Sequence, residues 1–228
     1  MEFLGFGPAG YGDELAWGMA ITLVFSLTCY FFALVIGVVL GLMASSRYTV
    51  LRVYWRVHSS IIMGVPPLLI IFFVYFNLPL ITSSVLGQPV DISPFLAGVV
   101  ALSLNIGTYV GEVVRGAIFN IPRGQTDAVL ALALPFRIRW QKVFIPQIFR
   151  LALPGLSNLW LVLVKETALV SLVGLQDIVR VAKIAAGNTF QPFLFYIVVG
   201  VLFVVMGYLT MLISRHLDRR FNFWSASR

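Results

Sequence analysis

Long apolar runs separated by short charged stretches dominate the chain. Five runs reach the roughly 20 residues that a membrane-spanning helix needs. The last three each begin at a proline, which suits a helix start because the first turn leaves its backbone N–H groups without helical partners. The pattern predicts an all-α membrane protein, a single domain over residues 1–228, with spans at about Trp17–Met43, Val57–Leu80, Pro94–Phe119, Pro154–Val173 and Pro192–Ile213.

Two local features within these runs bear on helix geometry. The second run is interrupted by Gly64, Val65, Pro66 and Pro67; a hinge or unwound turn and a simple kink are the alternatives, and we expect the kink because neighbouring helices can satisfy the freed carbonyls. In the first run, the Gly37-x-x-x-Gly41 pair permits close approach of another helix, although such pairs do not identify the partner.

Composition agrees with a membrane protein. Of 228 residues, 60% are hydrophobic and 11% charged, and the mean hydropathy is +0.96; a soluble domain cannot bury that much apolar surface. The net charge of +7 could suggest a nucleic-acid partner. The charges instead lie between the apolar runs, as in cationic loops beside an anionic membrane, so we expect lipid and no nucleic acid.

Loop charges predict the orientation. The N-terminal stretch carries acidic residues and no Lys or Arg, so we expect no cleaved signal peptide and an extracytoplasmic N-terminus. With five spans the C-terminus is then on the cytoplasmic side. We expect the membrane to be the bacterial inner membrane. Thirteen of the sixteen basic residues fall on the cytoplasmic side: Arg47, Arg52, Arg56, Arg115, Arg123, Arg137, Arg139, Lys142, Arg150, Arg215, Arg219, Arg220 and Arg228.

Enzyme chemistry is not indicated. The sequence contains no G-x-x-x-x-G-K-[ST] phosphate loop. His58 and His216 are isolated, so we expect no metal site. The few ionisable residues within the spans do not support a hydrolytic site. We expect a transport subunit that binds no cofactor of its own.

The ionisable residues inside the predicted spans are the candidate solute pathway, because charges in hydrocarbon usually face a polar cavity or a partner. Glu112 lies in the third span, three residues before Arg115, and Asn158, Lys165 and Glu166 lie in the fourth. The alternative is internal pairing of Glu112 with Arg115 or Lys165, which would only hold helices together.

The cytoplasmic loop over about 120–153 is unusually long and structured. Thr126–Leu134 predicts a short helix broken at Pro135, and the basic, amphipathic stretch FRIRWQKVF follows and ends at Pro146. A helix–break–helix of this kind indicates either a docking surface for another protein or a helix that lies on the lipid headgroups.

This loop contains the sequence GAIFNIPRGQTDAVLALALPFRIRWQKVFIPQ. It resembles the EAA motif of ABC-importer permeases, in the polar amino acid branch that includes histidine/lysine/arginine/ornithine and octopine/nopaline permease subunits. The resemblance extends through Leu153-Pro154-Gly155, Asn158, KETALVSLVGLQDI and FQPF, from the first span to the tail. The matching motif residues are Arg115, Gly116, Ala117, Ile121, Pro122, Gly124, Gln125, Ala128, Ala131 and Pro146.

The core of the motif departs from the usual pattern. Asp127 replaces the Glu, Val129 the second Ala and Ala133 the Gly, and Met63 stands where an Arg usually precedes Gly-[TV]-Pro. The loss of the Gly matters because a helix-ending turn often needs φ > 0, and Pro135 is an alternative source of the break. These departures put the strength of coupling in question and favour a heterodimer with a partner of stricter motif over a homodimer.

The resemblance implies a type I ABC importer permease fold with a cytoplasmic coupling helix. Its expected partners are two ATP-binding subunits that hydrolyse ATP, a second permease subunit and an extracytoplasmic solute-binding protein. The coupling residues would be Gly124, Gln125, Asp127, Ala128, Ala133 and Pro146. The solute would be a polar, and we expect basic, amino acid or an opine. The alternatives are a gradient-driven secondary transporter, for which no internal repeat is visible, and a small channel.

Overall fold

The computed structural model describes residues 4–7, 10–88 and 91–222, with side chains up to residue 216; Arg228 of the expected cytoplasmic tail lies outside the described residues. The described chain is helical, without strands. Its elements are α1 (Gly12–Ala44), α2 (Thr49–Gly64), α3 (Pro67–Leu86), α4 (Pro94–Phe119), α5 (Arg123–Ala131), α6 (Phe136–Ile138), a π-helical segment η2 (Arg139–Phe144), α7 (Ile145–Glu166), a 3-10 segment η3 (Thr167–Val173), α8 (Ile178–Thr189) and α9 (Pro192–Asn222).

Five helical segments are long and apolar enough to cross a membrane, which confirms the predicted fold class. They are Gly12–Ala44, Pro67–Leu86, Pro94–Phe119, Phe136–Val173 and Pro192–His216. The first, third and fifth correspond to the predicted spans, and Pro94 and Pro192 begin their helices as expected. The second and fourth differ from the prediction.

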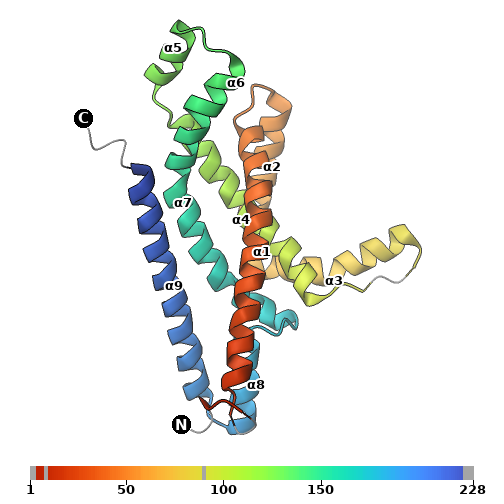
Figure 1. Ribbon diagram of the computed structural model, residues 1–228. Helices are drawn as coiled ribbons and strands as arrows, with labels where there is room; N and C mark the ends of the chain where they lie inside the picture. The colour runs from red at the N-terminus through yellow and green to blue at the C-terminus, as the bar shows by residue number, and fades with distance from the viewer. Residues whose placement is uncertain (1–3, 8–9, 89–90, 223–228) are drawn as a thin grey trace.

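Helix α4 is the centre of the bundle, and α1 crosses it at very close range (Figure 1). Gly37 and Gly41 of α1 face Gly107 and Gly111 of α4: a Cβ at Gly37 would lie 2.7 Å from the Gly107 carbonyl oxygen, and one at Gly41 would lie 2.9 Å from that of Gly111. The glycine pair therefore has a definite partner, a second pair of glycines at the same spacing, and the two backbones touch.

The predicted second span is two helices. Val65 (φ −102°, ψ 130°) and Pro66 (φ −56°, ψ 137°) are both extended, so the chain makes a true break where we expected a kink. The cause is the double proline, which removes two backbone donors and excludes the helical conformation for the residue before each ring. Helix α2 lies beside α1 and α4, whereas α3 projects sideways from the bundle (Figure 1).

The predicted fourth span starts too late in the sequence. Pro154 is an interior residue of α7, and Pro146 lies in the first turn of α7 and does not end a helix. The helix is continuous from Phe136 through η2 to Glu166. Proline is tolerated inside membrane helices because neighbouring groups and local widening of the helix satisfy the freed carbonyl.

A smaller core closes the opposite end of the bundle from α5. Residues 178–189, which the sequence reading leaves as a loop, form α8 and pack Ile178, Ala182 and Ala185 with Leu15 of α1 and Phe195 of α9. The first turns of α1 lie at this end (Figure 1). Helix α8 thus ties the first and last spanning helices together.

The α1–α4 contact yields a stability prediction. Gly37→Ala introduces a methyl group against Val110 and the Gly107 carbonyl, and overpacking of this kind costs about 1–3 kcal/mol. Gly200→Ala on α9 is the matched control, because a Cβ there meets nothing within 4 Å. We expect the first variant alone to unfold at lower temperature in detergent. Equal midpoints for both variants would contradict a backbone contact at Gly37.

Candidate functional site

Helix α5 stands apart from the membrane bundle at the end where α4 finishes and α7 begins (Figure 1). It covers Arg123–Ala131, three residues earlier at each end than the predicted Thr126–Leu134. Gly124, Gln125, Asp127 and Ala128 are all exposed on it. A nine-residue helix with so little burial is marginal on its own, so this element is suited to docking against another protein.

The motif departure at Val129 has a structural explanation. Val129 is the one buried residue of α5, with 3% of its surface exposed, so its larger side chain packs inward. The outer surface is instead formed by the small and polar residues named above and by Leu130 and Leu132, which are 58% and 70% exposed. Replacement of Ala by Val at this position therefore leaves the outer docking face unchanged.

Ala133 occupies a conformation that favours glycine. Its φ is +47°. The Leu134 N–H donates to the Val129 carbonyl at 3.3 Å and the Ala133 N–H donates to that of Leu130 at 3.0 Å, which is the hydrogen-bond pattern of a Schellman motif. The turn therefore ends α5 as a glycine-terminated helix would, and Pro135 follows this turn without causing it. An L-residue in this region costs about 1–2 kcal/mol.

Ala133→Gly should consequently stabilise the end of α5 by about 1 kcal/mol. We expect amide hydrogen exchange over residues 128–134 to slow about fivefold, since local opening controls exchange there. Ala131→Gly, two residues earlier at the last position of α5, should speed exchange because glycine is less favourable than alanine in a helical conformation. If both substitutions changed the exchange rate in the same direction, the backbone conformation at position 133 would not be the cause of the change.

The predicted pathway residues of α7 divide between its exposed and half-buried surfaces. Asn158 and Lys165 are exposed and, seven residues apart, lie on one face of the helix. Glu166, the last residue of α7, is half-buried, and its Oε2 is buried without a hydrogen-bond partner among the described residues. Glu166 is therefore a carboxylate with unused acceptor capacity.

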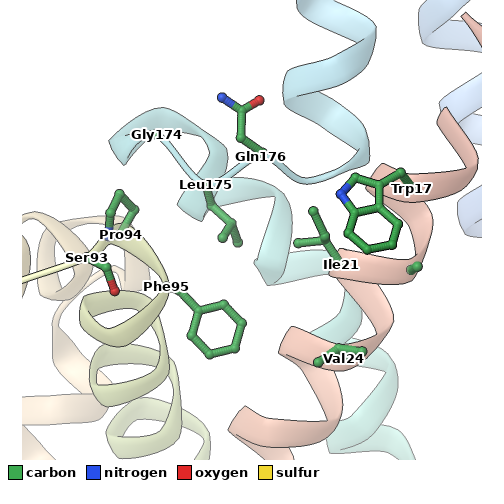
Figure 2. Close-up of a pocket in the computed structure, with 10 residues that line it drawn as sticks. Trp17, Ile21, Val24, Ser93, Pro94, Phe95, Gly174, Leu175 and Gln176 are labelled. Carbon is green, nitrogen blue, oxygen red and sulfur yellow. The ribbon is translucent and has the colours of Figure 1, made fainter. Parts of the chain in front are cut away.

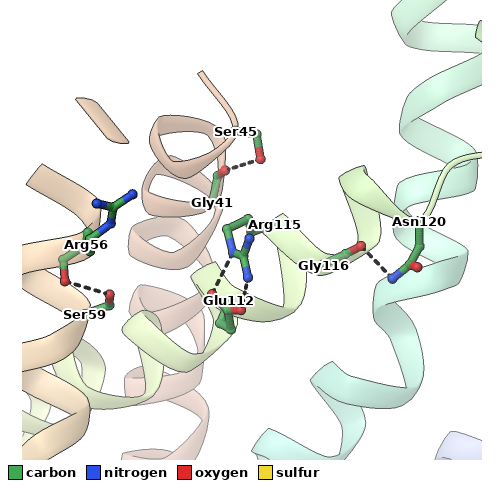
Figure 3. A network of polar contacts seen from close by, with 8 residues as sticks. All are labelled: Gly41, Ser45, Arg56, Ser59, Glu112, Arg115, Gly116 and Asn120. Carbon is green, nitrogen blue, oxygen red and sulfur yellow. Dashed lines mark hydrogen bonds and ion pairs between the residues drawn. The ribbon is translucent and has the colours of Figure 1, made fainter. Parts of the chain in front are cut away.

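Glu112 lies toward the other end of the bundle and is already paired. The Arg115 Nε donates to Glu112 Oε2 at 2.8 Å, and the Arg115 Nη2 donates to Glu112 Oε1 (Figure 3). This is the i, i+3 pairing that the sequence left open, and it occurs with Arg115 and not with Lys165. Both oxygens of Glu112 are engaged, and the two membrane carboxylates do not share one site.

Two pockets lie at opposite ends of the bundle. The larger, about 510 Å³, lies where α1 and α4 begin, and Trp17, Ile21, Phe95 and Leu175 give it an apolar wall (Figure 2). It has no charged lining residue, so it does not suit a cationic solute. The smaller, about 300 Å³, contains Glu112 and three arginines.

Asp177 is a fully buried carboxylate that sequence reasoning missed, although an Asp directly before a helix is typical of an N-cap. Its Oδ1 accepts from the Arg180 backbone N–H at 2.9 Å and so caps α8, while its Oδ2 has no partner among the described residues. Burial raises the pKa of Asp177 from 3.8 to about 6, more than the cap hydrogen bonds and Arg180 lower it.

The raised pKa of Asp177 predicts a pH-dependent stability difference. The unfolded chain releases this proton near pH 3.8 and the folded chain near pH 6, so the native state loses up to about 3 kcal/mol as pH rises through this interval. Asp177→Asn keeps a capping oxygen without the charge. Its melting temperature should exceed that of wild type at pH 7.5 and approach it near pH 4.

Asp91→Asn, at an exposed position, is the control for removal of an acidic charge. If the difference in melting temperature between Asp177→Asn and wild type were the same at both pH values, the result would contradict a buried, titrating carboxylate.

Five helices long and apolar enough to cross a membrane, with a further helix exposed outside the bundle, define the class of protein: a multi-pass helical membrane protein. The chain belongs to the family of binding-protein-dependent transport system inner membrane components, which it matches over residues 33–223. It is thus a multi-pass inner-membrane protein.

The individual relatives agree with this family. The chain is 40% identical to the nopaline transport system permease protein NocQ of Agrobacterium fabrum over 90% of both chains. It is 30% identical to the histidine/lysine/arginine/ornithine transport system permease protein HisQ of Salmonella typhimurium, over 93% of this chain and 95% of HisQ. The fold matches a crystal structure of an amino acid ABC transporter with histidines, at TM-score 0.81 and 28% identity over 92% and 95% of the two chains.

Proposed function

We propose that this chain is one permease subunit of an ATP-driven importer of cationic amino acids or opines. The exposed coupling helix α5 is the observation that carries the proposal, because a helix with one buried residue needs a partner surface. Two ATP-binding subunits would dock there and supply the ATP hydrolysis, and an extracytoplasmic binding protein would deliver solute to the opposite end. The names of the relatives support this class of solute.

The proposed orientation places α5 in the cytoplasm and the N-terminus and α8 outside. Arg123, Arg137 and Lys142 in and after α5 are exposed, and they favour the cytoplasmic side under the positive-inside rule. Docking of a soluble ATPase at α5 and of a binding protein at the α8 end follows from this orientation. A gradient-driven carrier or a channel would need neither surface.

Glu166 is the stronger candidate for solute contact. Glu166 is half-buried, and its buried Oε2, which has no partner among the described residues, can accept a hydrogen bond from a cationic group, whereas Glu112 is held by Arg115 through two bonds. Asn158 and Lys165 extend the polar face of α7 that this chain alone leaves exposed. A second permease subunit facing it would close the pathway, and Lys165 would hold the solute carboxylate.

A heterodimer is the proposed assembly. Gly124, Gln125, Asp127 and Ala128 retain an exposed docking face on α5, but Ala133 strains the turn that fixes the helix end. A partner with glycine at that position would transmit ATP-driven movement through a more stable helix end. Pro146, at the base of α7, would transfer the displacement of α5 to the membrane helices. Nucleotide shifts such a two-state device by binding one state better.

The experiment is uptake by proteoliposomes that contain the complete transporter, with ATP inside and binding protein outside. We expect ATP-dependent uptake of arginine or lysine, and Glu166→Gln should lower it at least about tenfold, the equivalent of about 1.4 kcal/mol for one lost charge-assisted hydrogen bond. A neutral polar amino acid should be affected less, because it lacks the cationic side chain.

Glu112→Gln is the matched control, since it also removes one membrane carboxylate. Equal loss for cationic and neutral solutes in Glu166→Gln would contradict solute contact and indicate a structural role. Uptake driven by an ion gradient without ATP would overturn the importer itself.

A further inference from the structure

A polar pocket of about 300 Å³ opens between α1, α2 and α4, at the end of the bundle near α5. It is lined by Ala44, Arg52, Trp55, Arg56, Ser59, Glu112, Arg115 and Phe119. Figure 3 shows Arg56 on α2 and the Glu112–Arg115 pair on α4, near the last turn of α1. The solute pathway proposed along α7 does not involve α1 or α2, so this pocket is separate from it.

The pocket carries unbalanced positive charge. Glu112 is its only carboxylate and is engaged by Arg115. Among the described residues, the Arg52 guanidinium donates only to the Thr49 hydroxyl, at 3.2 Å, and the Arg56 guanidinium has no hydrogen-bond or ion-pair partner. Two guanidinium groups therefore remain without an anion, and a cationic solute would be repelled from this pocket.

The surroundings of the pocket place it at the edge of the apolar band. Helix α1 ends at Ala44, and Leu42 is exposed just before that end. On α2, Val53 and Val57 are exposed beside the two arginines. Phe119, which is 65% exposed, lines the pocket where α4 ends, and the buried Trp55 forms part of its inner wall.

We propose that this pocket binds the phosphate of an anionic phospholipid headgroup. Guanidinium groups match phosphate oxygens with paired hydrogen bonds, and the volume is at the lower end of the range for small-molecule sites, about 300–1,000 Å³. The exposed Leu42, Val53 and Val57 would be covered by acyl chains. Free phosphate would leave these side chains, which neighbour the lining residues in sequence, uncovered. Lipid is therefore the occupant that satisfies both the charge of the pocket and the exposed apolar side chains of α1 and α2.

The bound lipid would brace α2 against α1 and α4. Besides its short link to α1, α2 is held by the buried Trp55, by the core contacts of Ile62 and Met63, and by His58, whose Nε2 lies 3.0 Å from the Thr108 hydroxyl of α4. A headgroup bonded to Arg52 and Arg56 on α2 and to Arg115 on α4 would add an ionic attachment. This role is independent of the solute and of ATP, and goes beyond the proposed transport function.

The test is lipid binding by the complete transporter in neutral detergent, followed by native mass spectrometry and thermal unfolding during titration with phosphatidylglycerol or phosphatidylcholine. Wild type should prefer phosphatidylglycerol and melt at higher temperature with it. Arg52→Gln/Arg56→Gln should bind phosphatidylglycerol about 30-fold more weakly, since each basic residue near an anionic surface contributes roughly a factor of five. Both residues are exposed, so this variant should fold.

The matched control is Arg47→Gln/Arg137→Gln, which removes two exposed arginines outside the pocket. It should keep the preference for phosphatidylglycerol. Equal loss in the two double variants, or equal binding of both lipids by wild type, would overturn the proposal. If millimolar inorganic phosphate raised the melting temperature as much as phosphatidylglycerol does, the pocket would be an anion site without lipid specificity, and the proposal would be wrong. Crosslinking of the pocket to an acidic segment of another subunit, with no lipid retained, would also overturn it.

Discussion

Direct contact between the backbones of α1 and α4 is the constraint on which the rest of the structure depends. A Cβ at Gly37 or Gly41 would meet the carbonyl oxygen of Gly107 or Gly111. The side chains of Val110 and Val114 fill the space beside the two α1 glycines. In a membrane the hydrophobic effect does not hold helices together, so close packing of this kind carries the association. With α4 held at the centre, α7 packs on another side of it and α2 and α3 are positioned at its ends.

The charged side chains of this protein differ in whether a neighbouring group compensates their charge, which matters because the surroundings have a low dielectric constant. Glu112 is neutralised within its own helix by Arg115, and Asp177 is buried with one oxygen engaged by an N-cap hydrogen bond. Glu166 has an unsatisfied oxygen, and the arginines of α2 have no anion among the described residues. The unsatisfied groups are the informative ones, because an uncompensated charge near hydrocarbon needs a ligand, a lipid or a partner subunit.

Helix α5 shows how a motif departure can leave the local geometry intact. The turn after α5 has the hydrogen bonds of a glycine-terminated helix although Ala133 occupies the glycine position. Ala133 adopts this conformation although it is unfavourable for alanine, so the path of the chain beyond α5, which leads into η2 and α7, outweighs the local preference. The cost is about 1–2 kcal/mol at one residue, which the rest of the bundle can offset.

The sequence by itself determined the number of spans, the helical class and the projecting loop, because in lipid a continuous apolar helix satisfies its own backbone. The sequence did not determine the effect of each proline. Pro66 breaks a helix, whereas Pro146 lies in the first turn of α7 and Pro154 lies inside it. Likewise, only the tertiary structure showed that Gly37 faces Gly107, that Glu112 pairs with Arg115, and that Asp177 is buried. Each outcome depends on which neighbour fills the space or supplies the hydrogen bond, and local sequence does not contain that information.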